Sequence, residues 1–164
     1  DSDSFMGVMR AKTGFLSFDL PTEAQWEYAG RAGTTSALNS GKNLVSIEED
    51  PGMAEVGRYK YNGGEGNARG DLSSGTARVG SYTPNAWDLY DIHGNVWEMC
   101  LDWKDAYSGL ASDPKGASSG TMRVNRGGSW ANDAPSCRSS NRGGSAPEST
   151  GGGRVGFRVA MTLP

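Results

Sequence analysis

The sequence predicts an α+β domain in which long, ordered loops make up much of the chain. Its 164 residues are enough for one ordinary domain with a single core. The chain contains 25 glycines and 35% hydrophobic residues, a composition typical of glycine-rich loops rather than of a helical bundle. Helical spacing of apolar residues occurs near the start, whereas the later apolar runs are short. Five Trp and six Tyr argue against disorder, because they supply large buried areas.

A short helix is expected from Asp1 to Gly14. Phe5 and Val8 lie three positions apart, so their side chains share one face of a helix. Asp1 and Ser2 are residue types that cap helix starts, and Gly14 is a residue type that ends helices. The segment is therefore predicted to be a capped helix.

A second, better marked helix is expected after a short strand-like run over residues 15–20, which ends at Pro21. Thr22 is followed three residues later by Gln25, the spacing of a capping box in which each residue bonds the other's backbone N–H. Apolar residues then recur at helical spacing until Gly33. These signals predict a helix with a well-defined start.

The rest of the chain is predicted to be loops joined by short strands. Residues 34–84 are polar and rich in Gly, Asn and Ser, so we expect a loop-rich insert there. Strands are expected at four apolar runs, residues 15–18, 96–101, 122–124 and 155–161. Between the last two, residues 126–154 almost lack aliphatic side chains. A structureless connection of this length in a compact domain is usually a binding or active-site loop.

Composition argues against several classes of partner. The net charge is −3 and the basic residues form no run, so no nucleic-acid partner is expected. No apolar run reaches the length of a membrane span, and no signal peptide is recognisable. The two cysteines, Cys100 and Cys137, allow one disulfide, but the sequence leaves their pairing open.

Three motifs carry a resemblance to a known family. They are LPTEAQWEYAGRAG at residues 20–33, NAWDLYDIHGNVWEMCLDW at 85–103, and the RGGSW, CRSSNR and GFRVA segments within 126–160. In this order they resemble the sulfatase-modifying-factor, or formylglycine-generating-enzyme, family, whose fold is a variant of the C-type lectin fold. The resemblance implies that residues 1–164 form the C-terminal part of one C-type-lectin-like domain, with 34–84 as its insert and 123–160 as a variable ligand-binding region. It also implies that an N-terminal portion of the domain is missing and is needed to cover apolar surface.

The resemblance does not extend to the chemistry of the enzymes. Members that make formylglycine carry two cysteines five residues apart after GGS, and two thiolates together suit Cu(I). Here Cys137 matches the second cysteine, while Asn132 stands at the first position. Relatives that bind iron need several histidines, and this chain has His93 alone. We therefore expect neither copper nor iron, and no enzymatic activity; an oxidase that uses other ligands is the alternative.

A calcium site is a further implication of the resemblance. Family enzymes bind Ca²⁺ in the turn before the GNVWE strand, which here gives the side chains of Asp91 and Glu98 and the carbonyls of Gly94 and Val96. Such hard oxygen ligands suit Ca²⁺. The alternative is that the two carboxylates accept backbone hydrogen bonds and hold the turn. The enzymes' second calcium site has no convincing match in residues 55–72.

The long loop resembles the variable region of retroelement-diversified proteins, such as the phage major tropism determinant and a treponemal variable surface protein. In that group adenine mutation of asparagine codons never yields Lys, Glu, Gln, Met or Trp. The positions that obey this exclusion, together with Trp130 as an apolar anchor, are the predicted ligand-binding residues: Trp130, Ala131, Asn132, Asp133, Ser136, Asn141, Gly143, Gly144, Ser145, Ala146, Ser149, Thr150, Gly151, Gly152, Gly153 and Arg154. The alternative is an ordinary Gly/Ser-rich loop.

These observations favour a non-enzymatic, receptor- or adhesin-type protein that displays a diversified C-terminal surface. The partner would be a protein or cell-surface ligand, and the protein would be extracellular or surface-exposed. Two alternatives stay open. One is an enzyme of the same family, such as a formylglycine-generating-type oxidase, and the other is a lectin-like surface module with a fixed partner.

Overall fold

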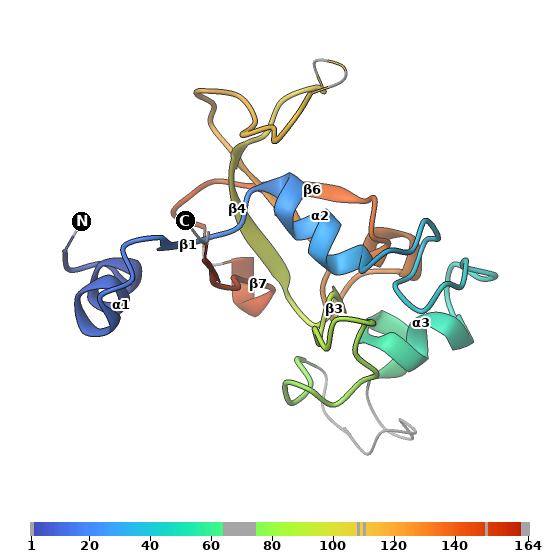
Figure 1. The fold of residues 1–164 in the computed structure, drawn as a ribbon. Helices are drawn as coiled ribbons and strands as arrows, with labels where there is room; N and C mark the ends of the chain where they lie inside the picture. The colour runs from blue at the N-terminus through green and yellow to red at the C-terminus, as the bar shows by residue number, and fades with distance from the viewer. Residues whose placement is uncertain (1, 64–74, 108, 110, 150, 162–164) are drawn as a thin grey trace.

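The computed structural model describes residues 2–63, 75–107, 109, 111–149 and 151–161, and it confirms the predicted loop-rich α+β class (Figure 1). The helices are α1 (Phe5–Thr13), α2 (Glu23–Arg31) and α3 (Pro51–Val56), with 3₁₀ helices η1 (Lys60–Asn62), η2 (Ala134–Cys137) and η3 (Gly151–Gly153). The strands are β1 (Phe18–Asp19), β2 (Gly57–Arg58), β3 (His93–Gly94), β4 (Trp97–Trp103), β5 (Arg123–Arg126), β6 (Arg142–Ser145), β7 (Val155–Gly156) and β8 (Ala160–Met161).

Helix α2 begins with the predicted capping box. The Thr22 side chain accepts a hydrogen bond from the backbone N–H of Gln25 at 3.2 Å, and the Gln25 side chain accepts one from the backbone N–H of Thr22 at 2.9 Å. The helix ends slightly before Gly33, because Ala32 takes the left-handed conformation at φ 45° and acts as the C-cap. Trp26 faces inward and is 1% exposed.

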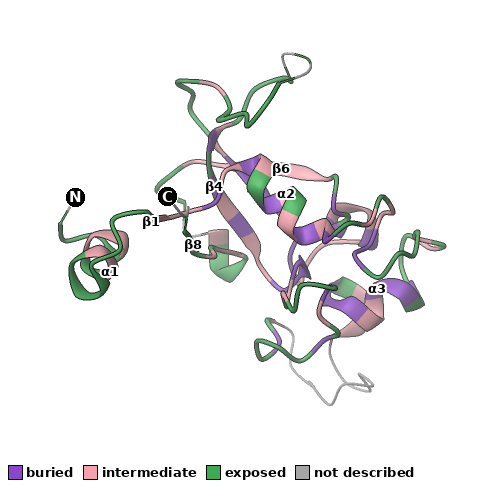
Figure 2. Cartoon of the chain, viewed as in Figure 1, coloured by how far each residue is buried: buried purple, intermediate pink, exposed green. Residues whose placement is uncertain are grey.

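Helix α1 starts later than predicted. Its N-cap is Ser4, whose hydroxyl accepts from the backbone N–H of Gly7 at 3.1 Å, so Ser2 is not the cap and Asp1 lies outside the described residues. Gly14, at φ 75°, ends the helix as expected. None of its residues is buried, and α1 extends to the side of the molecule (Figure 2). Phe5 is 55% exposed and contacts the ring of Phe157 at 5.3 Å between centroids.

The main sheet has four strands in the order β6-β5-β4-β7, and α2 packs on β4 and β5. Strands β4, β5 and β6 pair antiparallel, whereas β7 runs parallel to β4. Under α2 lies one core cluster, formed by Trp26, Ile92, Cys100 and Val124. Among the described residues, no helix is long and apolar enough to cross a membrane.

The predicted strand boundaries need two corrections. The run 15–18 bends in a turn in which Phe18 N–H bonds the Phe15 carbonyl at 3.4 Å, so β1 forms only where β8 can pair with it. The run 155–161 is not one strand. Its first residues (β7) pair with β4 and its last residues (β8) pair with β1, so the chain changes sheets between them.

The loop-rich insert also packs into the interior. Its described part contains α3, β2 and η1, and it supplies Leu38, Met53, Val56 and Tyr59 to a second core cluster that includes Ala134 and Cys137. Asp50 is 1% exposed and caps α3, because its carboxylate accepts backbone N–H bonds from Met53, Val45 and Ser46. These bonds lower the pKa of Asp50, although burial itself acts in the opposite direction. The region 55–72, considered for a second calcium ion, lies partly outside the described residues.

Residues 126–154 are also more ordered than predicted. They contain η2, β6 and η3, and β6 pairs with β5 from Arg126↔Arg142 to Arg123↔Ser145. The sequence gives no strand signal here, because β6 reads RGGS and has no β-branched or aromatic residue. Pairing with β5 determines this strand, and it makes the long connection part of the sheet.

Candidate ligand-binding surface

The predicted ligand-binding residues form a partly exposed layer over the core. Ala131, Asn132, Asp133, Ser136, Asn141, the β6 residues and Ala146 are half-buried; Ser149, Gly152, Gly153 and Arg154 are exposed; Thr150 lies outside the described residues. The same segment also sends Ala134, Cys137 and Ser139 into the interior, each at 0% exposed. The segment thus carries both surface and core positions.

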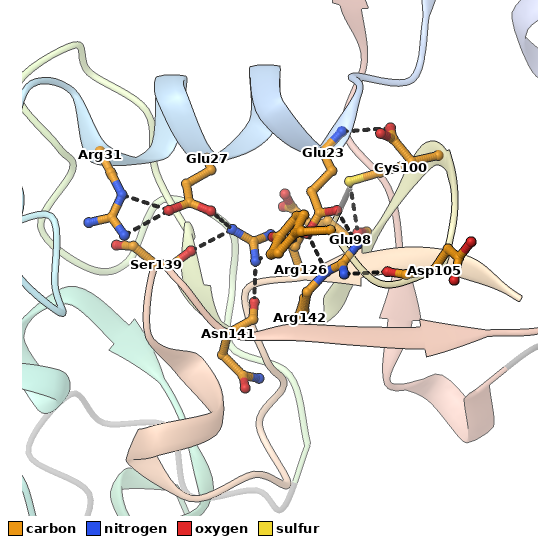
Figure 3. Close-up of polar contacts among 12 residues, drawn as sticks. Glu23, Glu27, Arg31, Glu98, Cys100, Asp105, Arg126, Ser139, Asn141 and Arg142 are labelled. Carbon is orange, nitrogen blue, oxygen red and sulfur yellow. Dashed lines mark hydrogen bonds and ion pairs between the residues drawn. The ribbon is translucent and has the colours of Figure 1, made fainter. Parts of the chain in front are cut away.

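The buried side chain of Arg126 binds the backbone of this layer from its interior side. Its guanidinium is fully buried and donates hydrogen bonds to the carbonyls of Asn141 at 2.6 Å and Ser139 at 2.7 Å (Figure 3). The same group pairs with the carboxylate of Glu27 on α2. Arg126 therefore connects the backbone of the variable segment to the helix, with charge-assisted bonds that are stronger than neutral ones.

Arg142 makes a second connection between the segment and α2. Its guanidinium binds the Glu23 carboxylate at two points, with Nε–Oε1 at 2.8 Å and Nη2–Oε2 at 2.5 Å. Its Nη1 donates to the carbonyl of Asp105 (Figure 3). Arg126 and Arg142 thus both connect the segment that contains β6 to α2.

The insert supports the other side of the surface through its backbone. Lys60 N–H bonds the Asn132 carbonyl at 3.0 Å, Ala134 N–H bonds the Ile47 carbonyl at 3.2 Å, and Ser139 N–H bonds the Ala37 carbonyl at 2.9 Å. These three contacts place residues of the insert beside the predicted surface.

The insert also contributes side chains that the sequence analysis did not include. Val45 is 80% exposed and Ile47 63% exposed, and both lie in the loop that contacts η2. Lys60 approaches the carboxylate of Asp133 at 3.4 Å. No sequence signal could have identified these residues, because their position depends on how the insert packs.

Three of the predicted display positions are half-buried and also make contacts within the fold. The Asn132 side-chain oxygen accepts from both the N–H and the hydroxyl of Ser129, at 3.1 and 2.6 Å. The Asn141 amide donates to the Ser136 carbonyl at 2.8 Å. A Cβ at Gly143 would lie 2.1 Å from Oδ1 of the buried Asn125. Substitution at any of these three positions would therefore change a contact within the fold as well as the surface.

Other predicted positions face outward. Trp130 is half-buried, its indole N–H reaches the Gly153 carbonyl at 3.4 Å, and the Arg154 guanidinium lies 5.8 Å from its ring. Asp133 is half-exposed and has Lys60 beside it. Trp130 and Arg154 thus combine an apolar ring with a neighbouring charge, a combination that suits a protein-binding surface.

The two cysteines are free, so they do not form the disulfide that the sequence allows. They belong to different core clusters, Cys100 under α2 and Cys137 beside the insert. Burial raises the pKa of the Cys137 thiol to about 12 and also raises that of Cys100. Gly128, at φ 76°, lets the backbone pass Cys137, because a Cβ there would lie 2.5 Å from Sγ.

The Glu98 carboxylate of the predicted calcium site is bound by other side chains. Both Glu98 carboxylate oxygens are bound by Arg158, at 2.5 and 2.6 Å, and Trp26 donates its indole N–H to one of them at 2.5 Å. Asp91 accepts from Gly80 N–H at 2.8 Å, while its other oxygen is buried without a hydrogen bond. Within the described residues, no three His, Cys, Asp or Glu side chains cluster as metal ligands. The structure does not test calcium binding at this turn, which would require Glu98 to leave Arg158.

Comparisons with known proteins agree with this architecture. The family model of the sulfatase-modifying factor enzyme 1-like domain matches residues 4–163. The chain is 38% identical over 152 residues to a formylglycine-generating enzyme of Streptomyces coelicolor, covering 86% of this chain and 46% of that enzyme.

Two solved structures share both the fold and sequence similarity. Treponema denticola variable protein 1 matches with a TM-score of 0.69 at 36% identity, covering 88% of this chain and 47% of that one. PvdO from Pseudomonas aeruginosa matches with a TM-score of 0.78 at 32% identity, covering 96% and 57%. The chain spans about half the length of these relatives. It belongs to the sulfatase-modifying factor enzyme 1-like family and has the C-type-lectin-like fold of that family.

Proposed function

We propose that this chain binds a protein or cell-surface ligand through the surface formed by residues 130–154 and the adjoining insert, and that it carries out no formylglycine-type oxidation. The observation that carries the proposal is the side chain of Asn132. It stands five residues before Cys137, and its oxygen is directed to Ser129 by two hydrogen bonds.

The chemistry of copper supports the proposed absence of oxidase activity. Cu(I) bound between two sulfurs needs two thiolates, and an amide oxygen is a poor ligand for a soft ion. The Cys137 thiol is buried, its pKa is raised to about 12, and Asn132 occupies the other position. A thiol with this pKa is almost entirely protonated near neutral pH, so a metal ion would first have to displace its proton.

The binding function is supported by how the segment is held. Arg126 and Arg142 attach the segment to α2, while Ser149 and Arg154 of the same segment are exposed. A rigid framework with free surface side chains suits recognition, because the ordering entropy is already lost before a ligand arrives. The similarity to a variable protein supports diversification of the segment by a retroelement.

Two further expectations belong to this proposal. The protein acts outside the cell or on its surface, where a displayed binding surface meets its partner. In addition, the exposed apolar side chains near α1, such as Phe5 and Leu16 at 55% and 80% exposed, are covered by polypeptide beyond these 164 residues.

Copper titration together with a peptide assay tests the proposal. The wild-type chain should bind no stoichiometric Cu(I) and should leave the cysteine of a sulfatase-motif peptide unchanged. The matched variant is Asn132→Cys, which restores the cysteine spacing and should bind Cu(I) more tightly than the wild type. Conversion of the peptide by the wild-type chain would overturn the proposal in favour of an oxidase.

Diversification by a retroelement has a separate test in the DNA beside the gene. That DNA should contain a near-copy template rich in AAC codons and a reverse transcriptase gene; without them this part of the proposal fails.

A further inference from the structure

The loop that precedes α3 exposes two large aliphatic side chains. Val45 is 80% exposed and Ile47 is 63% exposed, and a single residue separates them. Their Cα atoms therefore lie within about 7 Å of each other. The preceding Leu44 is half-buried and packs against the core cluster of the insert. Figure 2 shows this loop as a largely exposed stretch beside α3.

The buried carboxylate of Asp50 holds the backbone of this loop. Its Oδ2 atom accepts hydrogen bonds from the backbone N–H of Val45 at 2.6 Å and of Ser46 at 3.0 Å. The carbonyl of Ile47 accepts from the backbone N–H of Ala134, at the start of η2, at 3.2 Å. The two aliphatic side chains are thus carried by a backbone that is already ordered before a partner arrives, which lowers the entropy cost of binding.

The loop adjoins the proposed ligand-binding surface. The bond between Ile47 and Ala134 places the loop beside Asp133, which is the N-cap of η2 and one of the predicted ligand-binding residues. Lys60, from a later part of the insert, approaches the Asp133 carboxylate at 3.4 Å. A partner that covers the start of η2 therefore meets the exposed loop of the insert as well.

Carboxylates surround the two aliphatic side chains. Glu48 and Glu49 follow Ile47 directly and are exposed, and within the described part of the chain neither forms an ion pair. Asp50 adds a third carboxylate, which is bonded by backbone N–H groups. Three consecutive carboxylates thus lie at one end of the apolar pair.

The lysines on either side of this loop in the sequence do not compensate these charges. Lys42 pairs with Glu55 at 2.5 Å, and Lys60 pairs with Asp133 at 3.4 Å. Each pair is neutral as a whole, so the loop itself stays negative. An apolar pair beside uncompensated carboxylates is complementary to an apolar segment that carries Lys or Arg. The same carboxylates repel phosphate groups, which disfavours nucleic acids and anionic membranes as partners.

We propose that Val45 and Ile47 anchor a partner protein through a segment that carries lysine or arginine beside aliphatic side chains. This inference rests on the proposed binding function and names the chemistry of its partner. The anchor belongs to the insert, so it stays the same whichever residues occupy the variable positions of residues 130–154. The variable positions then select among partners, while the insert supplies a constant contact.

The test uses the 164-residue chain and three short peptides, with binding followed by NMR chemical-shift changes. The first probe is acetyl-Gly-Lys-Ile-Lys-Leu-Lys-Gly-amide. The second has Glu in place of each Lys, and the third has Ser in place of Ile and Leu. The first peptide should bind with a dissociation constant of about millimolar order or tighter, and the other two at least about tenfold more weakly. Salt should weaken the first peptide, because exposed charges are screened.

A double variant of the loop, Val45→Ser with Ile47→Ser, localises the contact. It removes the apolar groups and should bind the first peptide at least about tenfold more weakly than the wild type. Val79→Ser is the matched control. Val79 is 78% exposed, but it lies in the turn whose Gly80 N–H bonds Asp91, so this variant should bind as the wild type does.

A second pair of variants tests the charges. Glu48→Gln together with Glu49→Gln should weaken the first peptide at least about threefold and should reduce the effect of salt. Asp113→Asn removes an exposed carboxylate between β4 and β5 and should leave binding unchanged. Thermal melts of all variants separate loss of binding from loss of folding. If the double serine variant does not fold, Val45→Ser alone and the glutamine variant decide.

The inference is overturned if the first peptide does not bind the wild-type chain at about 10 mM, or if the acidic peptide binds as tightly. It is also overturned if the serine variant binds the first peptide as the wild type does. In that case weaker binding by Trp130→Ala would keep the proposed surface and remove only the anchor of the insert. Oxidation of a sulfatase-motif peptide by the wild-type chain would instead remove the proposed function, so the two can fail separately.

Discussion

The Nδ1 atom of His93 donates a 2.7 Å hydrogen bond to the backbone carbonyl of Cys137. Its Nε2 accepts from the backbone N–H of Asn39 at 3.0 Å. Because a carbonyl only accepts and an N–H only donates, the imidazole is neutral and carries its proton on Nδ1. His93 thus joins the insert, the turn before β4 and the variable segment in one contact, and the ring is 0% exposed.

Stability should fall as the pH is lowered from about 6.5 towards 4. Burial in the first place, with the positive charge of Arg31 in addition, lowers the pKa of His93 from 6.5 to about 4, although the bond to Cys137 acts in the opposite direction. In this window the unfolded chain binds a proton that the folded chain does not, so the free energy of unfolding decreases as pH falls. We expect a loss of about 2–3 kcal/mol between pH 7.5 and 4.5, measured by urea unfolding.

His93→Gln is the control for this pH dependence. A glutamine does not titrate, so the variant should be less stable at pH 7.5 and should lose less stability on acidification. Asp102 titrates with the opposite sign, since burial raises its pKa, and it is present in both proteins. Equal slopes for the variant and the wild type would show that His93 is not the titrating group.

Two adjacent glycines of β6 should respond differently to the same substitution. A Cβ at Gly143 would lie 2.1 Å from Asn125 Oδ1 and 3.1 Å from Trp97 Cζ3, and Asn125 is buried. A Cβ at Gly144 would meet Cδ of the exposed, flexible Lys104 at 2.5 Å. Gly143→Ala should destabilise by about 1–3 kcal/mol, and Gly144→Ala by no more than about 0.5 kcal/mol. Thermal melts of both proteins check this, and equal melting temperatures would contradict it.

Local signals explain which parts of the fold could be predicted from the sequence. Helix α2 was predictable because Thr22 and Gln25 are close in sequence and form the capping box by themselves. Strand β6 was not, because RGGS has no β propensity and pairs only once β5 is in place. Secondary structure that depends on a distant partner leaves little trace in its own residues.

The surface shows the same limit. Codon chemistry selected Asn132, Asn141 and Gly143 as display positions, yet each is held by a neighbour that is distant or internal to the segment. The composition of a segment shows which residue types it contains, but it does not show where their side chains point. The contribution of Val45 from the insert was likewise unpredictable, because an exposed apolar residue in a polar loop carries no functional pattern.

Arg126 should be the most sensitive polar residue of the framework. Replacing it with Met leaves the carbonyls of Ser139 and Asn141 without the bonds from Arg126, while the Glu27 carboxylate keeps its pair with Arg31. Each buried carbonyl left unsatisfied costs about 1–3 kcal/mol. Arg138→Met, at an exposed position of the same segment, should change stability by no more than about 0.5 kcal/mol. Chemical denaturation measures both, and a small effect of the Arg126 variant would mean that α2 does not hold the segment.

Calcium should leave the stability of this chain unchanged. Glu98 would have to exchange the charge-assisted bonds of Arg158 for the ion, and the Trp26 indole N–H also occupies one of its oxygens. Melting temperatures in excess Ca²⁺ and in EDTA should therefore coincide, because an ion that does not bind the folded state cannot stabilise it. A higher melting temperature in Ca²⁺ that disappears in Glu98→Gln would instead establish the site.

The thiol of Cys137 should be unreactive while the protein is folded. With its pKa raised to about 12 by burial, only about one molecule in ten thousand carries the thiolate at pH 8, and the sulfur is 0% exposed. Iodoacetamide should therefore label Cys137 only after unfolding. Ser140→Cys places a thiol at an exposed position three residues away, and it should be labelled rapidly under the same conditions. Peptide mass spectrometry separates the two sites from Cys100. Equal labelling rates at residues 137 and 140 would mean that the segment opens readily, and a surface that opens could not serve as a rigid binding platform.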